Sequence, residues 1–400
     1  MSGNETRDER PLELVPRLAR QGYEREQIAK RRAWAENKTG ADLEQVGQTA
    51  LSGEALRGNI ENPIGAAQVP IGVAGPLLIH GEHARGVFYV PMATTEGTLV
   101  RSYERGMVTA SRAGGVTARV HGDENCVSSV FVFADIALAC EFARELPTHI
   151  GQLQAVVGST TTHGALLRLD CHPVGRQVYI NLAFSTGDAH GMNMIARAGD
   201  AVRAWAVARF DVEHSLLFGG LESEKKPAAS LLAGGKGKKV SAAVDISAEI
   251  CQSHLHAAPE QMAELWRLTV IGSIQTGSIG YNGHAANLLT ALAIACGQDV
   301  ANVANAAIGI STMEVLKDGS LHISVTLPSL TLATVGGGTG LGTARECLEM
   351  MECFGSGRAL KLAEITAASV LAGELSIAAA LASGEFVASH ELYGRNRPQE

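Results

Sequence analysis

The feature that most constrains this chain is an apolar run near its C-terminus, ITAASVLAGELSIAAALA at residues 365–382. The run is long enough for about five turns of helix. It contains Glu374 and several small residues, and the chain has no stretch of about 18 apolar residues free of charges or polar breaks. We therefore expect a buried, tightly packed helix rather than a membrane span.

Small residues also dominate the rest of the composition. Aromatic residues make up 4% of the chain, which holds 45 glycines, so we expect its cores to depend on close approach of backbones. Hydrophobic residues reach 46%, which argues against wholesale disorder. A length of 400 residues predicts two or three domains. The net charge of −8 argues against a general nucleic-acid binder, although a local basic pocket for an anionic ligand remains compatible with it.

The cysteines and the first residues indicate where the protein works. Seven cysteines are scattered along the chain without a CxxC pair. An odd number at irregular spacing predicts neither a disulfide framework nor a structural zinc site, and it favours a reducing compartment. The polar start MSGNETRDERPLEL lacks the apolar segment of a secretory signal. We expect a cytoplasmic protein.

The sequence pattern changes along the chain. Residues 1–47 are rich in Arg, Glu and Gln, which predicts a helical segment on the surface or at a subunit contact. From residue 60, short β-branched runs alternate with Gly and Pro, as in strands joined by tight turns. Residues 127–217 show a strand, a helix, two strands and a helix, which predicts a small ferredoxin-like α/β unit. The polar C-terminal tail predicts a mobile segment.

Several polar residues stand where catalysis could use them, although each has a structural explanation when taken alone. Glu96 falls where a strand gives way to a helix, and a carboxylate there often only complements the helix dipole. Adjacent lysines such as Lys225 and Lys226 are usually solvated. Their apolar and small neighbours suggest partial burial instead. A partly buried ammonium needs a carboxylate partner and can polarise a carbonyl oxygen.

Other candidates lie on or beside predicted helices. His284 and Asn287 are three residues apart and share one helix face, although a lone His there is more often a core residue. Asp299, beyond the end of that helix, is by itself an ordinary turn residue. Gly191 would let a backbone approach a dinucleotide, although GxGxxG is absent. His390, in the C-terminal tail, is by itself a surface residue.

Taken in chain order, the motifs resemble those of 3-hydroxy-3-methylglutaryl-coenzyme A (HMG-CoA) reductase. The resemblance is carried by ENPIGAAQVPIGVAGPL, PMATTEGTLV, TGDAHGMNM, KKPAA, YNGHAANLLTALAIACGQD, TVGGGTG and a terminal SH before NR. It covers nearly the whole chain from residue 40 onward. It is strongest to the soluble prokaryotic form of class I, which lacks the membrane anchor of the eukaryotic enzymes.

The resemblance implies an α+β fold, with a small ferredoxin-like dinucleotide-binding domain inserted into a large mixed helix/sheet domain that binds acyl-CoA. The expected parts are an N-terminal helical segment, the large domain in two pieces, the small domain and a C-terminal flap, at residues 1–47, 48–126 with 218–385, 127–217 and 386–400. In this family the active site forms between subunits, so we expect a homodimer or a higher homo-oligomer. Neither nucleic acid nor membrane is an expected partner.

The implied reaction is a four-electron reduction of an acyl-CoA thioester to a primary alcohol, as in the conversion of HMG-CoA to mevalonate and CoA. It would use two equivalents of NADPH or NADH and no metal. Hydride arriving at the thioester carbon puts negative charge on oxygen, and a thiolate must later leave. A preorganised cation meets the first need and a proton donor meets the second.

Four residues receive catalytic roles from the motif matches. Lys225 would hold the developing oxyanion, and Asp299 would keep this lysine charged and oriented. Glu96 would stand close to that pair and donate a proton in the aldehyde step, for which burial would raise its pKa. His390 would protonate the departing thiolate from a flap that closes over the thioester.

The resemblance also assigns binding residues. Lys226 would pair with the acyl carboxylate, and Asn287 would support the catalytic lysine. Ser102 and Arg105 match positions near CoA. The expected binding residues for the nicotinamide cofactor are Asp188, Gly191, Met192, Asn193, Thr162 and His163.

Several positions depart from the family pattern. The segment HGDENC lacks the Arg that grips the acyl carboxylate in the family, and Phe218 stands where a Ser would form a second grip. Glu224 replaces an Asp before the lysine pair, Glu104 replaces an Asn near CoA, and His190 replaces a Met. Thr162 stands where an Arg would pair with the 2′-phosphate of NADPH, so the choice between NADPH and NADH stays open.

The catalytic residues thus survive together, whereas residues that grip the charged ends of the ligands do not. One missing charge-assisted hydrogen bond costs about 1.5–3 kcal/mol, or roughly ten- to a hundred-fold in affinity. Three interpretations follow: an HMG-CoA reductase with a rearranged grip, a relative that reduces a different acyl thioester, and a catalytically silent homologue that acts as a binding protein. The absence of GxGxxG argues against a Rossmann dehydrogenase.

Overall fold

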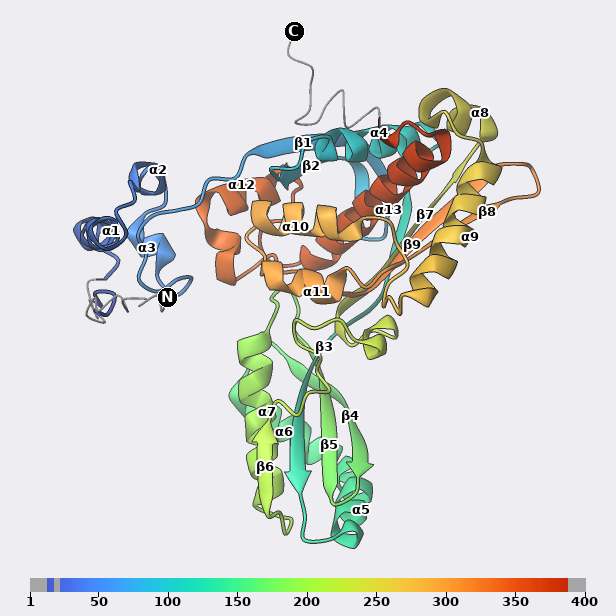
Figure 1. The fold of residues 1–400 in the computed structure, drawn as a ribbon. Coiled ribbons are helices and arrows are strands. Elements are labelled where there is room, and N and C mark those ends of the chain that lie inside the picture. The colour runs from blue at the N-terminus through green and yellow to red at the C-terminus, as the bar shows by residue number, and fades with distance from the viewer. Residues whose placement is uncertain (1–12, 18–21, 388–400) are drawn as a thin grey trace, which may run out of the picture. The chain divides into compact units, whose positions relative to one another are not determined.

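The computed structural model describes residues 13–17 and 22–387, which form two compact units (Figure 1). Among the described residues, the first unit comprises 13–17 and 22–69 with 340–342. Its helices are α1 (Arg25–Thr39), α2 (Glu44–Gly47) and α3 (Gly53–Leu56). The buried guanidinium of Arg31 donates to the carbonyl oxygens of Gly22 and Pro63, and these bonds tie the polar helix α1 to the chain around it.

The second unit is built on an antiparallel sheet in the order β4-β5-β3-β7-β9-β8, with β6 also paired to β3. The strands are β3 (Thr117–Val132), β4 (Ala165–Val174), β5 (Gln177–Ser185), β6 (His214–Leu217), β7 (Lys236–Ile246), β8 (Ile310–Val315) and β9 (Leu321–Leu330). The first half of β3 pairs with β7, and its second half pairs with β5 and β6. One continuous strand therefore serves both parts of this unit.

The part around the second half of β3 is a ferredoxin-like unit. Its strands lie in the order β4-β5-β3-β6, and its chain order is β-α-β-β-α-β. The helices are α5 (Ile136–Glu145), the short η1 (Leu146–His149), α6 (Ile150–Thr160) and α7 (Met192–Val207). Its core includes Phe131, Phe142 and Phe184. The predicted α+β fold class is confirmed. The domain boundaries stay a prediction, because β3 runs unbroken across residue 126.

The remaining part joins the other half of the sheet to a hairpin and helices. The hairpin strands are β1 (Ile71–His80) and β2 (Arg85–Ala93). The longer helices are α4 (Leu99–Arg112), α9 (Pro259–Gln275), α10 (Ala285–Ala295), α12 (Gly342–Met350) and α13 (Ala359–Ser383). The short helices are η2 (Ala229–Leu232), α8 (Ala248–Ile250), η3 (Cys251–Leu255), η4 (Val300–Asn302), α11 (Val303–Ala306) and η5 (Gly337–Gly340).

Helix α13 is the core helix predicted from the apolar run. Within the described residues it is the one helix long and apolar enough to cross a membrane, yet 83% of that apolar window is buried inside the protein. Its buried carboxylates bind backbone N–H groups. Glu364 accepts from residues 82–84 in the β1–β2 turn, and Glu374 accepts from Gly283 and His284 before α10. The helix therefore holds both the turn and the start of α10 in place.

Small residues allow α4 and α13 to approach closely, as the composition predicts. A Cβ atom added to Gly106 of α4 would lie 1.8 Å from the carbonyl oxygen of Ala372. A Cβ atom added to Gly373 of α13 would lie 2.2 Å from the ring of Tyr103. The helices could not keep this separation with larger residues at these positions.

The substitution Gly106→Ala tests this close packing. The added methyl group meets backbone, which cannot rotate away as a side chain can, so the free energy of unfolding should fall by about 1–3 kcal/mol. Urea unfolding measures the change. Gly158→Ala is the matched control, because Gly158 lies inside helix α6 with nothing within 4 Å of its added Cβ. The control should be neutral or slightly stabilising, and an equally stable Gly106→Ala variant would contradict the packing argument.

Candidate active site

An ion pair between Lys225 and Asp299 is the centre of the candidate site. Lys225 lies in the loop before η2, and Asp299 caps η4 by accepting the N–H of Ala301. The Lys225 Nζ atom is 2.7 Å from Asp299 Oδ2. Burial by itself would raise the pKa of Asp299, but the hydrogen bond and charge of Lys225 outweigh it and the pKa lies below its usual value. The carboxylate is therefore ionised at neutral pH.

The pair is partly exposed to solvent. The side chain of Lys225 is 43% exposed and that of Asp299 is 39% exposed. Both side chains are therefore open to solvent on one side in the single chain. An exposed ion pair contributes little stability, but an open ammonium can still donate a hydrogen bond to a ligand oxygen.

A second lysine–carboxylate pair joins Lys236 to Glu224, the residue that precedes Lys225 in the chain. The Lys236 Nζ atom is 2.6 Å from Glu224 Oε2 and donates to the carbonyl oxygen of Cys126 at 3.0 Å. The side chain of Lys236 is fully buried, and an unpaired charge there would be costly. Lys236 is not among the predicted site residues, because its local sequence GGKGKK is typical of a turn.

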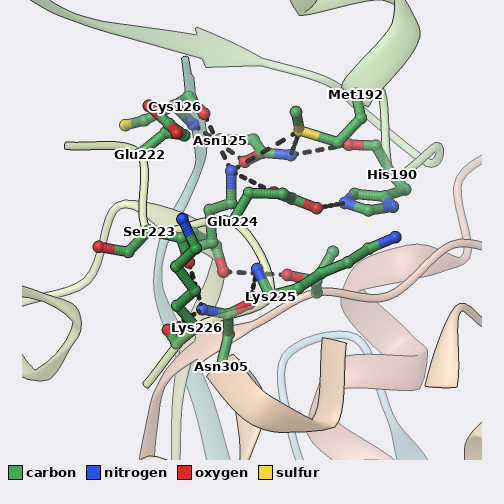
Figure 2. A network of polar contacts seen from close by, with 12 residues as sticks. Asn125, Cys126, His190, Met192, Glu222, Ser223, Glu224, Lys225, Lys226 and Asn305 are labelled. Carbon is green, nitrogen blue, oxygen red and sulfur yellow. Dashed lines mark hydrogen bonds and ion pairs between the residues drawn. The ribbon is translucent and has the colours of Figure 1, made fainter. Parts of the chain in front are cut away.

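His190 and Glu224, two of the departures from the family pattern, point toward one another in Figure 2. Their Nε2 and Oε1 atoms are 4.0 Å apart. Burial lowers the pKa of His190, although the charge of Glu224 opposes this shift. The imidazole is therefore neutral at neutral pH. Both facing atoms are buried and lack a hydrogen-bond partner within the described structure.

Glu96 and the predicted CoA-binding residues meet at a cavity of about 480 Å³ along α4, α10 and α13. Glu96, Ser102, Arg105 and Asn287 all contribute to its wall. Ser102 and Arg105 are held by Ser376 of α13: the Ser102 and Ser376 hydroxyls are 3.1 Å apart, and Arg105 Nη2 donates to the Ser376 carbonyl oxygen at 2.6 Å. The cavity therefore combines apolar walls with a fixed guanidinium.

Two predicted contacts to the lysine are absent from the single chain. Glu96 is exposed, and among the residues that the structure describes it forms no ion pair with Lys225 or Asp299. Neither Lys225 nor Asp299 lines the cavity that holds Glu96 and Asn287. One chain therefore does not by itself bring Glu96 and Asn287 together with the pair at this cavity. Because the site is expected to form between subunits, the roles of Glu96 and Asn287 stay predictions.

The loop of residues 223–226, called the lysine loop below, is held by Asn305, a residue that the sequence pattern did not mark as part of the site. Its carboxamide accepts the N–H of Lys225 and donates to the carbonyl oxygens of Ser223 and Lys226. Nothing in its local sequence VANAAIG distinguishes it from an ordinary helix residue. The side chain of Lys226 itself lies exposed on this loop.

The remaining departures can be placed as well. Glu104, which replaces an Asn near CoA in the family pattern, is ion-paired to Arg101 at 2.9 Å and is not buried. Phe218 is 49% exposed. His390 lies outside the described residues, so its predicted role stays a prediction.

The predicted cofactor residues fall into two groups around α7. Gly191 precedes the helix with φ 81°, and a Cβ atom there would lie 2.5 Å from Thr186, so only glycine suits this start. Met192 and the exposed Asn193 form the first turn. Thr162 and His163 are exposed in the turn between α6 and β4. Gly191 provides no side-chain cap, so the first N–H groups of α7 can bind an anion.

Asp188 has a structural contact that we did not expect. Its carboxylate accepts the N–H groups of Gly357, Arg358 and Ala359 at 2.7–3.0 Å, at the start of α13. Partial burial by itself would raise the pKa of Asp188, but these three donors and the charge of Lys238 outweigh it and the pKa lies below its usual value. Asp188 therefore ties the ferredoxin-like unit to the core helix.

Comparison with known proteins gives a consistent match. The profile of the family described as hydroxymethylglutaryl-coenzyme A reductase matches residues 27–395. The 3-hydroxy-3-methylglutaryl-coenzyme A reductase of Methanothermobacter thermautotrophicus is 41% identical over 373 residues, which cover 92% of this chain and 94% of the relative. That of Aeropyrum pernix is 42% identical over 375 residues, with coverage of 91% and 89%.

Solved structures agree at the level of the fold. The 3-hydroxy-3-methylglutaryl-coenzyme A reductase of Streptococcus pneumoniae superposes with a TM-score of 0.67 at 18% identity, over 88% of this chain and 96% of that one. A structure of the class II enzyme from this species, bound to NADPH in open conformations, gives a TM-score of 0.68 at 19% identity, over 89% and 86%. Two chains this different in sequence share the fold.

Replacing Asp188 with Asn should destabilise the protein at neutral pH, because an amide is a weaker acceptor for three N–H groups. The carboxylate has a lower pKa in the folded than in the unfolded state, so its stabilisation is present above the usual Asp pKa and disappears as pH falls through the folded value. Urea unfolding of both proteins from pH 7 to pH 3 should therefore show a gap that closes in acid. Asp211→Asn, on an exposed loop, is the control, and no gap at pH 7 would contradict the assignment.

Replacing Glu224 with Gln should lower the free energy of unfolding, because it leaves the buried Lys236 ammonium without a carboxylate partner. Removing one partner of a buried pair costs about 3–5 kcal/mol of unfolding free energy. The double variant Glu224→Gln/Lys236→Met should regain most of that loss, because no charge is left behind. Urea unfolding measures both. Glu264→Gln breaks an exposed pair with Arg267 and should change stability by less than about 1 kcal/mol; similar losses in Glu224→Gln and Glu264→Gln would refute the argument.

Proposed function

Because the chain belongs to the hydroxymethylglutaryl-coenzyme A reductase family, we propose that it reduces HMG-CoA to mevalonate and CoA with two equivalents of NADPH or NADH. The family predicted from the sequence motifs is confirmed. The observation that carries the proposal is the ion pair of Lys225 and Asp299, 2.7 Å apart on an open loop. The catalytically silent alternative receives no support from a site that keeps this pair.

Lys225 stabilises the charge that develops on the substrate oxygen. When hydride adds to the thioester carbon, the carbonyl π electrons move to oxygen and create an oxyanion. An ammonium already fixed by Asp299 can stabilise that oxyanion without reorganising, which is the main requirement for catalysis of this kind. The low pKa of Asp299 supports this role, because the carboxylate keeps its charge throughout the neutral range.

Two protons complete the balance of the reaction. Collapse of the first adduct breaks the carbon–sulfur bond, and the thiolate takes one proton to become the CoA thiol. A second hydride reduces the aldehyde, and the alkoxide takes the other proton to become the alcohol. We assign these donors to His390 and Glu96 respectively. The place of Glu96 on the wall of the cavity, next to Ser102 and Arg105, supports its contact with an acyl-CoA.

We further infer that a second copy of the chain completes the site in a homodimer. Glu96 and Asn287 line one cavity, whereas Lys225 and Asp299 face an open side of the same chain. A partner subunit that covers Lys225 with its own cavity would bring all four together. Exposed apolar residues on the β1–β2 hairpin, Val73, Val87 and Tyr89, support contact with another protein surface.

The cofactor would be held by the start of α7 and the nearby turn. Gly191, Met192 and Asn193 offer uncapped N–H groups for phosphate oxygens, and Thr162 and His163 offer exposed polar groups. The nicotinamide, when bound, supplies hydride. Asp188 contributes indirectly, because its carboxylate is engaged at the start of α13. We infer a cytoplasmic location, which the seven free cysteines support.

A different acyl thioester is the second candidate substrate. Phe218 is half exposed where a polar grip was expected, and no Arg occurs in HGDENC. An apolar side chain there would favour a thioester without a distal carboxylate. The two candidates differ in the acyl group alone and share the same catalytic pair.

The purified protein should oxidise two equivalents of NADPH or NADH for each HMG-CoA consumed. Lys225→Ala should lower kcat by about 10²- to 10³-fold, the usual cost of removing one donor to a developing oxyanion. The absorbance of the reduced nicotinamide measures both the stoichiometry and kcat. Lys317→Ala, on an exposed turn, is the matched control and should retain full activity.

Thioesters without the distal carboxylate distinguish the two substrates. Turnover of HMG-CoA alone supports the main proposal, and turnover of the carboxylate-free thioester alone supports the alternative. If neither thioester is reduced, or if Lys225→Ala retains wild-type kcat, the enzymatic proposal is refuted.

A further inference from the structure

The lysine loop has a backbone conformation that its sequence does not favour. Ser223 and Lys225 have φ values of 46° and 54°, in the left-handed region that residues other than glycine seldom adopt. Such residues keep this conformation only where surrounding contacts hold it. The conformation of Lys225 therefore depends on groups outside its own loop.

Asn305, on α11, provides these contacts (Figure 2). Its Oδ1 atom accepts the N–H of Lys225 at 2.8 Å. Its Nδ2 atom donates to the carbonyl oxygens of Ser223 and Lys226, both also at 2.8 Å. The residue is fully buried, so water does not compete for these bonds. Both amide protons and the oxygen are engaged, which leaves one orientation for the carboxamide.

The same short segment also holds the other end of the lysine. Asp299 and Asn305 belong to residues 299–306, which contain η4 and α11. Asp299 holds the ammonium of Lys225, whereas Asn305 holds its backbone N–H. A lysine side chain is a flexible four-carbon stem, so fixing both ends restricts where its charge can lie.

We propose that Asn305 is a positioning residue for Lys225. It holds the strained backbone of residues 223–226, so that the ammonium remains on Asp299 and aligned for a substrate oxygen. This inference rests on the proposed function, in which Lys225 stabilises the oxyanion. An aspartate at this position would retain an acceptor for the Lys225 N–H but lose both donors to the carbonyl oxygens. Small displacements of a catalytic group can cost about 10²-fold in rate.

The test compares Asn305→Ala and Asn305→Asp with the control Asn302→Ala. Asn302 lies on the same segment and is also buried, but within the described structure its side chain makes no hydrogen bond to the lysine loop. With HMG-CoA and NADPH, both Asn305 variants should lower kcat by about 10- to 100-fold. The KM for NADPH should stay unchanged, because the cofactor residues lie elsewhere. Asn302→Ala should retain wild-type kcat.

A rescue experiment separates positioning from simple stability. Glycine adopts positive φ without strain, so adding Ser223→Gly to Asn305→Ala should recover part of the lost kcat. A folded Asn305→Ala protein with wild-type kcat would overturn the proposal. So would an equal loss of kcat in Asn302→Ala, or a parallel loss of kcat and of affinity for NADPH.

A chemical measurement tests the same positioning without turnover. Amine acetylation of the intact protein, followed by mass spectrometry, reports the reactivity of Lys225 relative to its neighbour Lys226. Release of the loop should raise the ratio of Lys225 to Lys226 labelling in both Asn305 variants and leave it unchanged in Asn302→Ala. A wild type that reduces neither thioester with NADPH or with NADH would refute the proposed function alone. An unchanged labelling ratio in the Asn305 variants would refute the positioning role alone.

Discussion

Burial of helix α13 is the constraint on which the rest of the second unit depends. The helix packs against α4, α10, β7 and β9, and small residues such as Gly106 permit that close approach. Polar groups in such a core need partners. Glu364 and Glu374 therefore bind N–H groups of the β1–β2 turn and of the segment before α10, while Asp188 binds the first N–H groups of α13 itself. A single buried helix thus fixes the cavity wall and links it to the ferredoxin-like unit.

Two lysine–carboxylate pairs differ in burial, and this difference gives one lysine a structural role and leaves the other available to a substrate. Lys236 is fully buried and paired with Glu224, so its ammonium is not accessible to a ligand. Lys225 is half exposed against Asp299, so its ammonium remains available to a substrate oxygen. The sequence places both lysines in one short Gly- and Lys-rich stretch. Their surroundings, rather than their residue type, separate the two roles.

Several parts of the structure could be predicted from the sequence because they depend on local pattern. Alternating strands and helices in residues 127–217 predicted the ferredoxin-like unit, and the apolar run predicted the buried helix α13. Ordered motifs predicted the family. Asn305 was missed, because its three hydrogen bonds reach across about 80 residues to a loop that is near it only in the folded chain. Chain order likewise does not determine which predicted catalytic residues one subunit brings together, and Glu96 lines a cavity that neither Lys225 nor Asp299 lines.

By itself, the sequence determined the fold class, the family and the identity of the lysine and its acidic partner. The fold class of residues 127–217 follows from local periodicity, whereas the family and the lysine with its acidic partner follow from the resemblance of the ordered motifs to one known family. Only the tertiary structure decided that the loop of Lys225 is strained, that a buried carboxamide holds it, and that Asp188 serves the start of α13. Backbone strain and the pairing of buried polar groups arise from the packing of distant segments, and no local pattern specifies which segments will meet.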